Sequence, residues 1–541
     1  MFNGLVKVPE TRNEKPRDYA PGSQERELIQ QTLARMKSEE IEIPLIIGGK
    51  EVKTGDTKEI RPPHETAHRL GVFHRAGKEE VKLAIQSALE AREKWSKLPW
   101  EERAAIFRKA AELLTGPWRA TINAATMLGQ SKTPHQAEIE AACELADFWR
   151  FNVLYMHQIF QNQPFSPKEM WNRVEYAPLE GFIYAITPFN FTAIAGNLPT
   201  SPALMGNTVL WKPASTAVYS AYYVMKLLQQ AGLPDGVINF IPASGAKISD
   251  DILSDPNLAG IHFTGSTAVF QDIWKKVGNN LPNLKYYPRI VGETGGKDFI
   301  FAHNTADVKA LVTATIRGGF EYQGQKCSAA SRIYIPQSIW EDFKGLYVEK
   351  VGKIKVGNIE DFSNFMGAVI DKKAFDDIVA YIEYARSSGE AEIITGGEYD
   401  DSKGFFIQPT TIVTTNPKFK TMEEEIFGPV VTIYIYQDED LEATLELCNN
   451  TSPYGLTGAI FAKDRYAINK MTKQLRHAAG NFYINDKPTA AVVNQQPFGG
   501  GRASGTNDKA GSIINLLRWI STRAIKETFV SPTDWTYPYM K

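Results

Sequence analysis

Three cysteines, Cys143, Cys327 and Cys448, are the first residues to consider for covalent chemistry. Cys327 stands among small residues in Gln325-Lys326-Cys327-Ser328-Ala329, after a helix-like run and before a strand, which predicts a loop position. A thiol there can act as a nucleophile once it is ionised. For a single cysteine the inert, buried interpretation is the commoner one, and it suits Cys143, in an alanine-rich helix, and Cys448, late in another.

Glu293 is the second candidate for chemistry. It stands in Gly292-Glu293-Thr294-Gly295-Gly296-Lys297, directly after an apolar strand and before two glycines. Placing a carboxylate at such a position costs free energy unless the group is paired or functional. Taken alone, Glu293 would be interpreted as a salt-bridged turn residue. Together with the cysteine segment, it becomes a candidate general base.

Three polar segments follow strands that would lie side by side in a parallel sheet. Asn190, in Pro188-Phe189-Asn190-Phe191, offers an amide donor for an oxyanion, although a turn-capping role is also common. Lys212, in WKPAS, ends the next strand, where open α/β sheets bind ligands. Gly265 and Ser266 precede a helix whose N–H groups can face a pyrophosphate, a weak signal by itself. No G-x-G-x-x-G fingerprint is present, so spacing alone indicates an α/β enzyme and no named reaction.

The elements that must position these residues form two α/β series. From residue 181 to residue 293, short apolar strands alternate with helix-length segments, which predicts right-handed crossovers and a parallel sheet. One crossover helix, over 218–230, is followed by Gly232 and Pro234, typical of a helix end. A second series follows residue 298. Amphipathic helices are predicted over 79–95 and 101–114.

Composition excludes several classes of protein. The 541 residues suggest several domains, and 43% hydrophobic with 23% charged residues is ordinary for a globular chain. Lys and Arg number 60 against 62 for Asp and Glu, so no nucleic-acid partner is expected. No apolar run reaches the roughly 20 residues of a membrane span. With few cysteines and no apolar signal core, we expect a cytoplasmic enzyme, and a processed mitochondrial matrix form would look the same.

Three motifs carry a family resemblance: ETGGK from Glu293, GQKC from Gly324, and EIFGP from Glu425. In this order they resemble the aldehyde dehydrogenase superfamily. The resemblance implies an α/β fold with a Rossmann-type cofactor domain, an α/β catalytic domain and a β-flap that builds homodimers or higher homo-oligomers. The implied division is an N-terminal arm at 1–40, an NAD-binding domain at 41–160 and 182–296, a flap at 161–181 and 502–541, and a catalytic domain at 297–501.

The resemblance also implies a mechanism with NAD as cofactor and no metal. Cys327 attacks the aldehyde, and Asn190 with the N–H of Cys327 holds the oxyanion. Hydride leaves to nicotinamide, and Glu293 activates the water that hydrolyses the thioester. Because Ser215 is not a carboxylate, weak use of NADP is expected as well. The cofactor-binding residues that the resemblance implies are Thr187, Pro188, Phe189, Lys212, Ser215, Gly265, Ser266, Glu425 and Phe427.

Within the superfamily, three stretches resemble the glutamate semialdehyde (pyrroline-5-carboxylate) dehydrogenases: FNFTAIAGNLP from Phe189, QGQKCSAASR from Gln323 and NDKPTAAVVNQQPFGG from Asn485. The resemblance implies oxidation of L-glutamate γ-semialdehyde to L-glutamate, the second step of proline degradation. Substrate-binding residues are implied at Glu144, Phe191, Ser328, Ala490, Ala491 and Phe498. Glu144 has a rival interpretation as an ordinary surface glutamate. Ala490 departs from the glycine usual in this family, and the added methyl group can shift the backbone donors of the loop.

Two alternatives remain at this point. One is a dehydrogenase of another semialdehyde, including a CoA-acylating one, but a CoA route commonly dispenses with the carboxylate that Glu293 supplies. The other is a thiol hydrolase or acyltransferase, which would explain Cys327 but neither EIFGP nor WKPAS.

Overall fold

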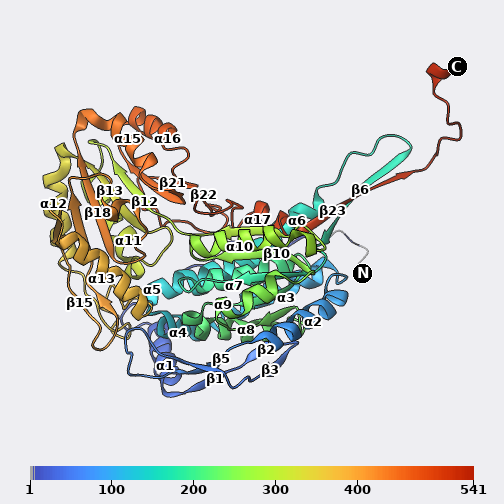
Figure 1. The fold of residues 1–541 in the computed structure, drawn as a ribbon, viewed down its shortest axis with the longest axis horizontal. Helices are drawn as coiled ribbons and strands as arrows, with labels where there is room; N and C mark the ends of the chain where they lie inside the picture. The colour runs from blue at the N-terminus through green and yellow to red at the C-terminus, as the bar shows by residue number, and fades with distance from the viewer. Residues whose placement is uncertain (1–3, 5) are drawn as a thin grey trace.

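The computed structural model describes residues 4 and 6–541, and it consists of two α/β lobes and a projecting two-stranded ribbon (Figure 1). Residues 1–3 and 5 of the predicted arm lie outside the described residues. The α/β fold class predicted from the alternation of strands and helices is confirmed.

The first lobe is built on a sheet with the strand order β11-β10-β7-β8-β9-β2-β3. The five strands β11 to β9 in this order run parallel, as predicted, whereas β2 and β3 add an antiparallel edge that the alternation did not predict. The strands are β2 (Leu45–Ile47), β3 (Lys50–Val52), β7 (Phe182–Ile186), β8 (Thr208–Lys212), β9 (Ile238–Phe240), β10 (Leu258–Thr264) and β11 (Arg289–Glu293).

Helices cover both faces of this sheet, because its strands are apolar on both sides. The predicted amphipathic helices are α2 (Lys78–Trp95) and α3 (Trp100–Thr115), and the crossover helix α8 (Val218–Ala231) ends at Gly232 with φ of 99°. The remaining helices of this lobe are α4 (Arg119–Gln130), α5 (Pro134–Ala137), the π-helix η1 (Glu138–Glu144), α6 (Leu145–Gln161), α7 (Thr192–Leu204), α9 (Gly245–Leu253), α10 (Thr267–Asn280), and the 3₁₀ turns η2 (Ser215–Ala217) and η3 (Leu281–Asn283).

The second lobe has a sheet of order β14-β17-β18-β13-β12-β20-β21, in which β14 alone is antiparallel to its neighbour. Its strands are β12 (Asp298–Ala302), β13 (Ala330–Pro336), β14 (Ala391–Thr395), β17 (Thr410–Thr414), β18 (Val430–Tyr436), β20 (Thr457–Phe461) and β21 (Asn481–Ile484). Its helices are α11 (Val308–Phe320), η4 (Glu321–Gly324), α12 (Gln337–Val351), α13 (Lys372–Arg386), α14 (Lys420–Glu423), η5 (Asp438–Asp440), α15 (Leu441–Asn450) and α16 (Arg465–Gln474). Two short pairs, β15 (Tyr399–Asp400) with β16 (Phe406–Ile407) and β19 (Tyr454–Gly455) with β22 (Gly501–Arg502), lie at its edges.

The N-terminal segment runs along the first lobe before its first helix, α1 (Gln24–Ser38), which packs on α4. Ser23 caps α1 by accepting a hydrogen bond from the N–H of Arg26. A small sheet of β1 (Ile41–Ile43), β5 (Gly71–His74) and β4 (Thr57–Ile60) follows. Residues 6–20 form no helix or strand, and they therefore depend on the body of the protein for their position.

The ribbon consists of β6 (Met170–Pro178) and β23 (Ile520–Thr528), paired antiparallel from Ile520–Pro178 to Thr528–Met170. It projects from the body, and the C-terminal segment with η6 (Pro538–Met540) extends beyond it (Figure 1). Between β22 and β23, the chain returns to the first lobe through α17 (Ile513–Leu517), which packs beside α6.

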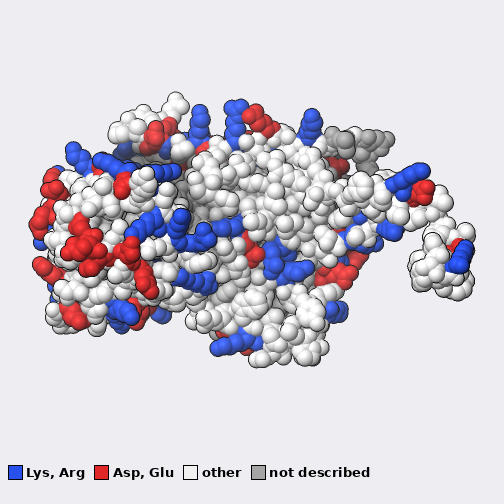
Figure 2. Space-filling view, turned by 90° about the horizontal axis from the view of Figure 1, so that it is seen from above, with Lys and Arg blue, Asp and Glu red and all other residues white. Residues whose placement is uncertain are grey.

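Figure 2 shows basic and acidic side chains interspersed on one face of the molecule, with wide uncharged areas between them. Within residues 4 and 6–541, no helix is long and apolar enough to cross a membrane.

Candidate active site

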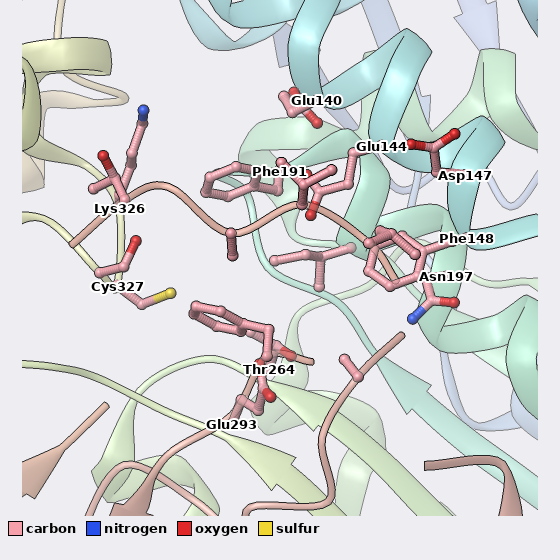
Figure 3. A pocket seen from close by; sticks show the side chains of 18 of the residues that line it. Glu140, Glu144, Asp147, Phe148, Phe191, Asn197, Thr264, Glu293, Lys326 and Cys327 are labelled. Carbon is pink, nitrogen blue, oxygen red and sulfur yellow. The ribbon is translucent and has the colours of Figure 1, made fainter. Parts of the chain in front are cut away.

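A cavity of about 440 Å³ lies between the two lobes, and it is lined by all the predicted catalytic and substrate-binding residues except Asn190. Cys327 and Glu293 face each other across one end, and Glu144 points in from the other (Figure 3). Eight residues predicted from the sequence line the cavity. Besides Cys327, Glu293 and Glu144, they are Phe191, Ser328, Ala490, Ala491 and Phe498. The folding of residues far apart in sequence therefore builds one site.

The loop that carries Cys327 begins with an unusual turn. Tyr322 and Gln323 both have left-handed backbone conformations, with φ of 52° and 56°, and Gly324 follows with φ of 66°. A side chain at position 324 would place its Cβ 2.2 Å from the carbonyl oxygen of Gly428, so the GQKC and EIFGP motifs touch at a point that only glycine permits. The two motifs are thus parts of a single packed loop assembly.

The side chain of Gln323 offsets part of this backbone strain. Its amide nitrogen donates to the carbonyl oxygens of Ser131 (3.1 Å) and Ala368 (2.7 Å), and its amide oxygen accepts from the N–H of Gly367 (3.0 Å). Ser131 belongs to the first lobe and the other two residues to the second. Gln323 therefore ties the nucleophile loop to both lobes.

Asn190 lies beside the same loop. Its buried side-chain amide donates to the backbone oxygen of Gln325 at 3.1 Å, two residues before the nucleophile. That bond uses one of the two amide hydrogens, and the other remains for an oxyanion on a carbon attached to Cys327.

Both reacting groups rest in their neutral forms. Burial, and then the charge of Glu293, raises the pKa of the Cys327 thiol well above its usual range. Burial likewise raises the pKa of Glu293 to about 8, opposed by Lys509 and reinforced by Asp508. A carboxyl group with this pKa can take up and release a proton near neutral pH, which a general base must do.

The substrate end of the cavity is acidic and is held by the π-helix η1. A π-helix widens the helical turn, and such segments are frequent at functional sites. Glu140 is paired with buried Lys132 at 2.7 Å, while Glu144 lines the cavity itself. Burial, and then Glu140, raises the pKa of Glu144 to about 8. The interpretation of Glu144 as an ordinary surface glutamate is therefore wrong.

The loop that carries Ala490 and Ala491 presents backbone donors. No described residue accepts a hydrogen bond from the N–H of Ala490 or Ala491, although both residues line the cavity. Ser328 is buried next to the nucleophile. These groups suit a carboxylate, which accepts several hydrogen bonds at once.

The N-terminal segment closes the far end of the cavity. The side chain of Asn13 donates to Asp147 and to the carbonyl oxygen of Val493, both at 2.8 Å, and the N–H of Glu14 donates to Asp147 at 2.7 Å. Asn13, Glu14 and Pro16 all line the cavity. The arm thus forms part of the wall of the site.

A buried ion-pair network fixes the arm in this position. Arg119 pairs with Glu138 and with Glu14 (2.8 Å), and Arg150 pairs with the other oxygen of Glu14 (2.7 Å). Tyr19 donates to Glu138 at 2.7 Å. Arg119 and Glu138 are almost fully buried, with side chains 3% and 0% exposed, so each depends on the other for its charge.

The predicted cofactor residues lie along the carboxyl ends of β7, β8 and β10. The register of the sheet pairs Ile186 with Lys212 and Thr264 with Glu293, so these strands end at one edge. Pro188 and Ser215 follow β7 and β8 there, and Gly265 follows β10. Thr187 accepts from Trp211 at 3.0 Å, and Ser266 caps α10.

The second lobe contributes the other two predicted cofactor residues. The ring of Phe427, whose φ is 57°, meets that of Phe189 edge to face at 5.7 Å. Glu425 accepts from the N–H of Gly296 at 2.9 Å. Burial raises the pKa of Glu425 to about 7.

This edge fits a dinucleotide such as NAD. Lys212 is buried. Among the described residues, its ammonium group donates one long hydrogen bond, to the carbonyl oxygen of Pro213 at 3.4 Å. Burial lowers the pKa of Lys212 to about 8. A buried donor with so poor an acceptor suits ribose hydroxyls, and the N-terminus of α10 suits a pyrophosphate. Among residues 4 and 6–541, no group of His, Cys, Asp and Glu side chains is arranged to hold a metal ion.

Several residues of the site were missed from the sequence. Lys326 and Lys487 line the cavity, and both lie near Glu321, at 3.1 and 4.0 Å. Lys326 could have been predicted as a site residue, because it is a charged residue directly before the nucleophile. For Asn13 and Gln323 no such signal exists, because their partners are distant in the chain.

Comparison with known proteins agrees with this geometry. The model of the aldehyde dehydrogenase family matches residues 51–525, and the chain belongs to this family. It is an NAD-dependent aldehyde dehydrogenase by class, as its fold and its site predict.

The most similar proteins include two curated relatives. The chain is 54% identical over 536 residues to the mitochondrial delta-1-pyrroline-5-carboxylate dehydrogenase of Dictyostelium discoideum, covering 98% of this chain and 96% of that one. It is 48% identical over 530 residues to the human mitochondrial protein of the same name, covering 98% and 94%. A crystal structure of the Mycobacterium tuberculosis delta-pyrroline-5-carboxylate dehydrogenase bound with NAD superposes with a TM-score of 0.97 at 51% identity, covering 100% of both chains.

Proposed function

We propose that this chain catalyses the NAD-dependent oxidation of L-glutamate γ-semialdehyde, the open form of 1-pyrroline-5-carboxylate, to L-glutamate, the second step of proline degradation. The single observation that carries the proposal is the cavity in which Cys327 and Glu293 lie at one end and Glu144 at the other. The names of the similar proteins from Dictyostelium, human and Mycobacterium support the same substrate.

The reaction begins when the Cys327 thiol gives its proton to water and its sulfur attacks the aldehyde carbon. The resulting oxyanion accepts hydrogen bonds from the Asn190 amide and from the N–H of Cys327. NAD, when bound, accepts the hydride from that carbon, which leaves a thioester on the sulfur. Lys212, Ser266 and Glu425 would hold the cofactor through ribose hydroxyls and phosphate oxygens.

Glu293 completes the cycle by taking a proton from water, which then attacks the thioester. Its pKa of about 8 allows it to hold that proton until the acid product departs. The dry walls of the cavity, with Phe191 and Phe498, pack against the aliphatic chain of the substrate. Ser328 and the N–H groups of Ala490 and Ala491 bind its carboxylate, and Glu144 lies at its amino group.

A comparison of aldehydes tests this proposal. Glutamate semialdehyde should have a much higher kcat/KM than propanal, because propanal leaves the carboxylate donors unpaired at a cost of about 1.5 to 3 kcal/mol, roughly ten- to hundredfold in rate. Succinate semialdehyde, which lacks the amino group, should fall between the two. Equal rates for all three would show that another aldehyde is the substrate and would direct attention to Ala490. Cys327→Ala, which should bind NAD and oxidise none of them, is the control.

The assembly and the location of the enzyme are further parts of the proposal. The ribbon of β6 and β23 would pair with a second copy of the chain, with residues 297–501 forming the catalytic domain and residues 41–160 and 182–296 the NAD-binding domain. The small number of cysteines favours a reducing compartment such as the cytoplasm, whereas the names of the Dictyostelium and human relatives favour mitochondria. Fractionation of cells that express the chain distinguishes the two compartments.

A further inference from the structure

We propose that the same cavity opens the ring of the cyclic imine, with Glu144 donating the proton that allows water to convert 1-pyrroline-5-carboxylate into the aldehyde that Cys327 attacks. The inference rests on the proposed function, because it concerns the form in which the substrate of that site arrives.

The chemistry of the substrate creates the need for this step. The similar proteins are named for a pyrroline carboxylate, and a pyrroline is a cyclic imine with a double bond between carbon 5 and nitrogen. A thiohemiacetal forms from an aldehyde, so the C=N bond must be hydrolysed before oxidation. Water adds readily only to a protonated imine, and a positioned general acid accelerates such steps by about 100- to 10,000-fold.

Four carboxyl groups line the substrate end of the cavity, and three of them already have partners, including Glu14, which pairs with Arg119 and Arg150. Glu140 is bound by Lys132 (2.7 Å) and by the N–H of Ala193 (2.9 Å). Asp147 is bound by two groups of the N-terminal arm. No described residue forms a hydrogen bond with the carboxyl group of Glu144, which points into the cavity (Figure 3). Glu144 is therefore the carboxyl group that an incoming molecule meets.

The surroundings of Glu144 keep its proton in place. Burial, Glu140 and Asp147 raise its pKa, Lys132 and Lys326 oppose them, and the net result is a pKa of about 8. At neutral pH the group is therefore mostly a neutral acid. A carboxylate kept only to bind an ammonium group would rest as an anion. Glu144 becomes an anion when it gives up its proton, and the nitrogen that receives the proton becomes the cation beside it.

The step balances without any electron transfer. The proton of Glu144 passes to the ring nitrogen, the oxygen of one water molecule bonds to carbon 5, and the bond from carbon 5 to nitrogen breaks. Both protons of the water molecule are also transferred to the nitrogen. The products are an aldehyde, an ammonium group and the Glu144 carboxylate, which form an ion pair within the cavity. Solvent returns the proton to Glu144 after glutamate leaves.

The position of Glu144 suits the next step as well. It enters the cavity from η1, across from Cys327, so a ring that opens at Glu144 releases its aldehyde end toward the sulfur (Figure 3). The amino end stays beside the carboxylate that it has just created. Ring opening and placement of the aldehyde are thus one event.

A progress curve with enzyme in excess tests the proposal. The imine is mixed with NAD and enough enzyme to consume the free aldehyde in an initial burst of NADH. If the enzyme opens the ring, the rate of the slow phase after the burst rises about tenfold for a tenfold increase in enzyme concentration. A slow phase that is independent of enzyme concentration would overturn the proposal, because uncatalysed ring opening would then limit the rate. Absence of any NADH, burst included, would instead contradict the proposed function.

Glu144→Gln assigns the step to its residue. This variant should keep the amplitude of the burst, although the burst is slower because the amino group of the aldehyde loses its contact with Glu144. Its slow phase should lose its dependence on enzyme concentration. Glu79→Gln, the same chemical change at an exposed position of α2 outside the cavity, should keep that dependence. A Glu144→Gln slow phase that still scales with enzyme would overturn the role of Glu144.

A second measurement separates ring opening from oxidation. In Cys327→Ala, which cannot form the thiohemiacetal, exchange between the imine and the aldehyde hydrate can be followed by NMR saturation transfer at carbon 5. Cys327→Ala should speed this exchange at least about tenfold over buffer, and Cys327→Ala with Glu144→Gln should not. Equal exchange with the two proteins would overturn the proposal.

Discussion

At the scale of single residues, the site combines two neutral groups that must both change their protonation state. The thiol of Cys327 has a pKa raised by burial and by Glu293, and the carboxyl group of Glu293 has a pKa of about 8. Each group disfavours the negative charge of the other, because the two face the same cavity. A positive charge nearby therefore has a strong influence on the pH at which the enzyme works.

The first prediction concerns the pH dependence of deacylation. A carboxyl group with a raised pKa is protonated below that pKa and can serve as a base only above it. The kcat should therefore rise with pH with a midpoint near 8, the pKa of Glu293. Glu293→Gln should release at most one NADH per site at any pH. Steady-state NADH formation between pH 6 and about 9.5 measures both.

The second prediction concerns Lys509, whose ammonium group donates to the carbonyl oxygens of Gly480 and Gly499, both at 2.8 Å. Its charge lowers the pKa of Glu293. Lys509→Met should therefore move the midpoint of the kcat profile upward, and Lys509→Arg should leave it close to its original value. A midpoint that stays the same in Lys509→Met would remove Lys509 from this role.

At the scale of elements, the left-handed turn before Cys327 holds the nucleophile in place. Gln323 has a φ of 56° and binds three backbone groups. Gln323→Ala keeps the free-energy cost of the left-handed backbone conformation and loses the hydrogen bonds of the side chain. Gln323→Gly also loses the hydrogen bonds, but glycine removes the conformational cost. We expect Gln323→Ala to destabilise the protein by about 1 to 3 kcal/mol and Gln323→Gly to be roughly 1 kcal/mol better. Urea unfolding measures the stabilities; equal values for the two variants would contradict the assignment of strain.

The N-terminal arm is the second element on which the site depends. Arg119→Ala leaves Glu138 buried without its partner, so we expect a loss of about 3 to 5 kcal/mol of folding free energy. Arg12→Ala, in an exposed pair with Glu10, is the matched control and should unfold at the same urea concentration as the unchanged protein. If both variants unfold at the same urea concentration, the buried network contributes nothing to the free energy of unfolding.

These two elements also mark the limit of what the sequence could predict. The parallel strands and helices α2, α3 and α8 follow from local periodicity, and the positions of Cys327, Glu293 and Asn190 follow from chemistry and family motifs. The π-helix that presents Glu144, the turn at Gln323 and the position of the predicted arm in the cavity wall depend on contacts between distant residues. Local patterns carry no record of such contacts, so they were not predicted.

At the scale of the whole molecule, the ribbon and the C-terminal segment leave the body of the protein and expose large aromatic side chains. Trp535 and Tyr539 are 80% and 85% exposed, and Trp171 on β6 is 51% exposed. Exposed apolar groups at this density are typical of a surface that another chain covers. This feature supports the proposed pairing of two copies through the ribbon.

The last prediction follows from this surface. Trp171→Glu places a charge on the ribbon and should shift the protein toward the monomer, as measured by light scattering after gel filtration. Tyr466→Glu changes an aromatic residue that is 87% exposed on the second lobe and should leave the mass unchanged. An unchanged mass for both variants would place the contact between copies elsewhere.

The arm also has a consequence for the order in which the protein is made. Asn13 leaves the ribosome well before its hydrogen-bond partner Val493, which lies 480 residues later. At roughly 5 to 20 residues per second, the arm waits between about 24 and 96 seconds for that partner. Through that interval the substrate end of the cavity has no complete wall. The arm is therefore synthesised early relative to its partner and placed late, and the growing chain acquires its closed site only after Val493 has emerged.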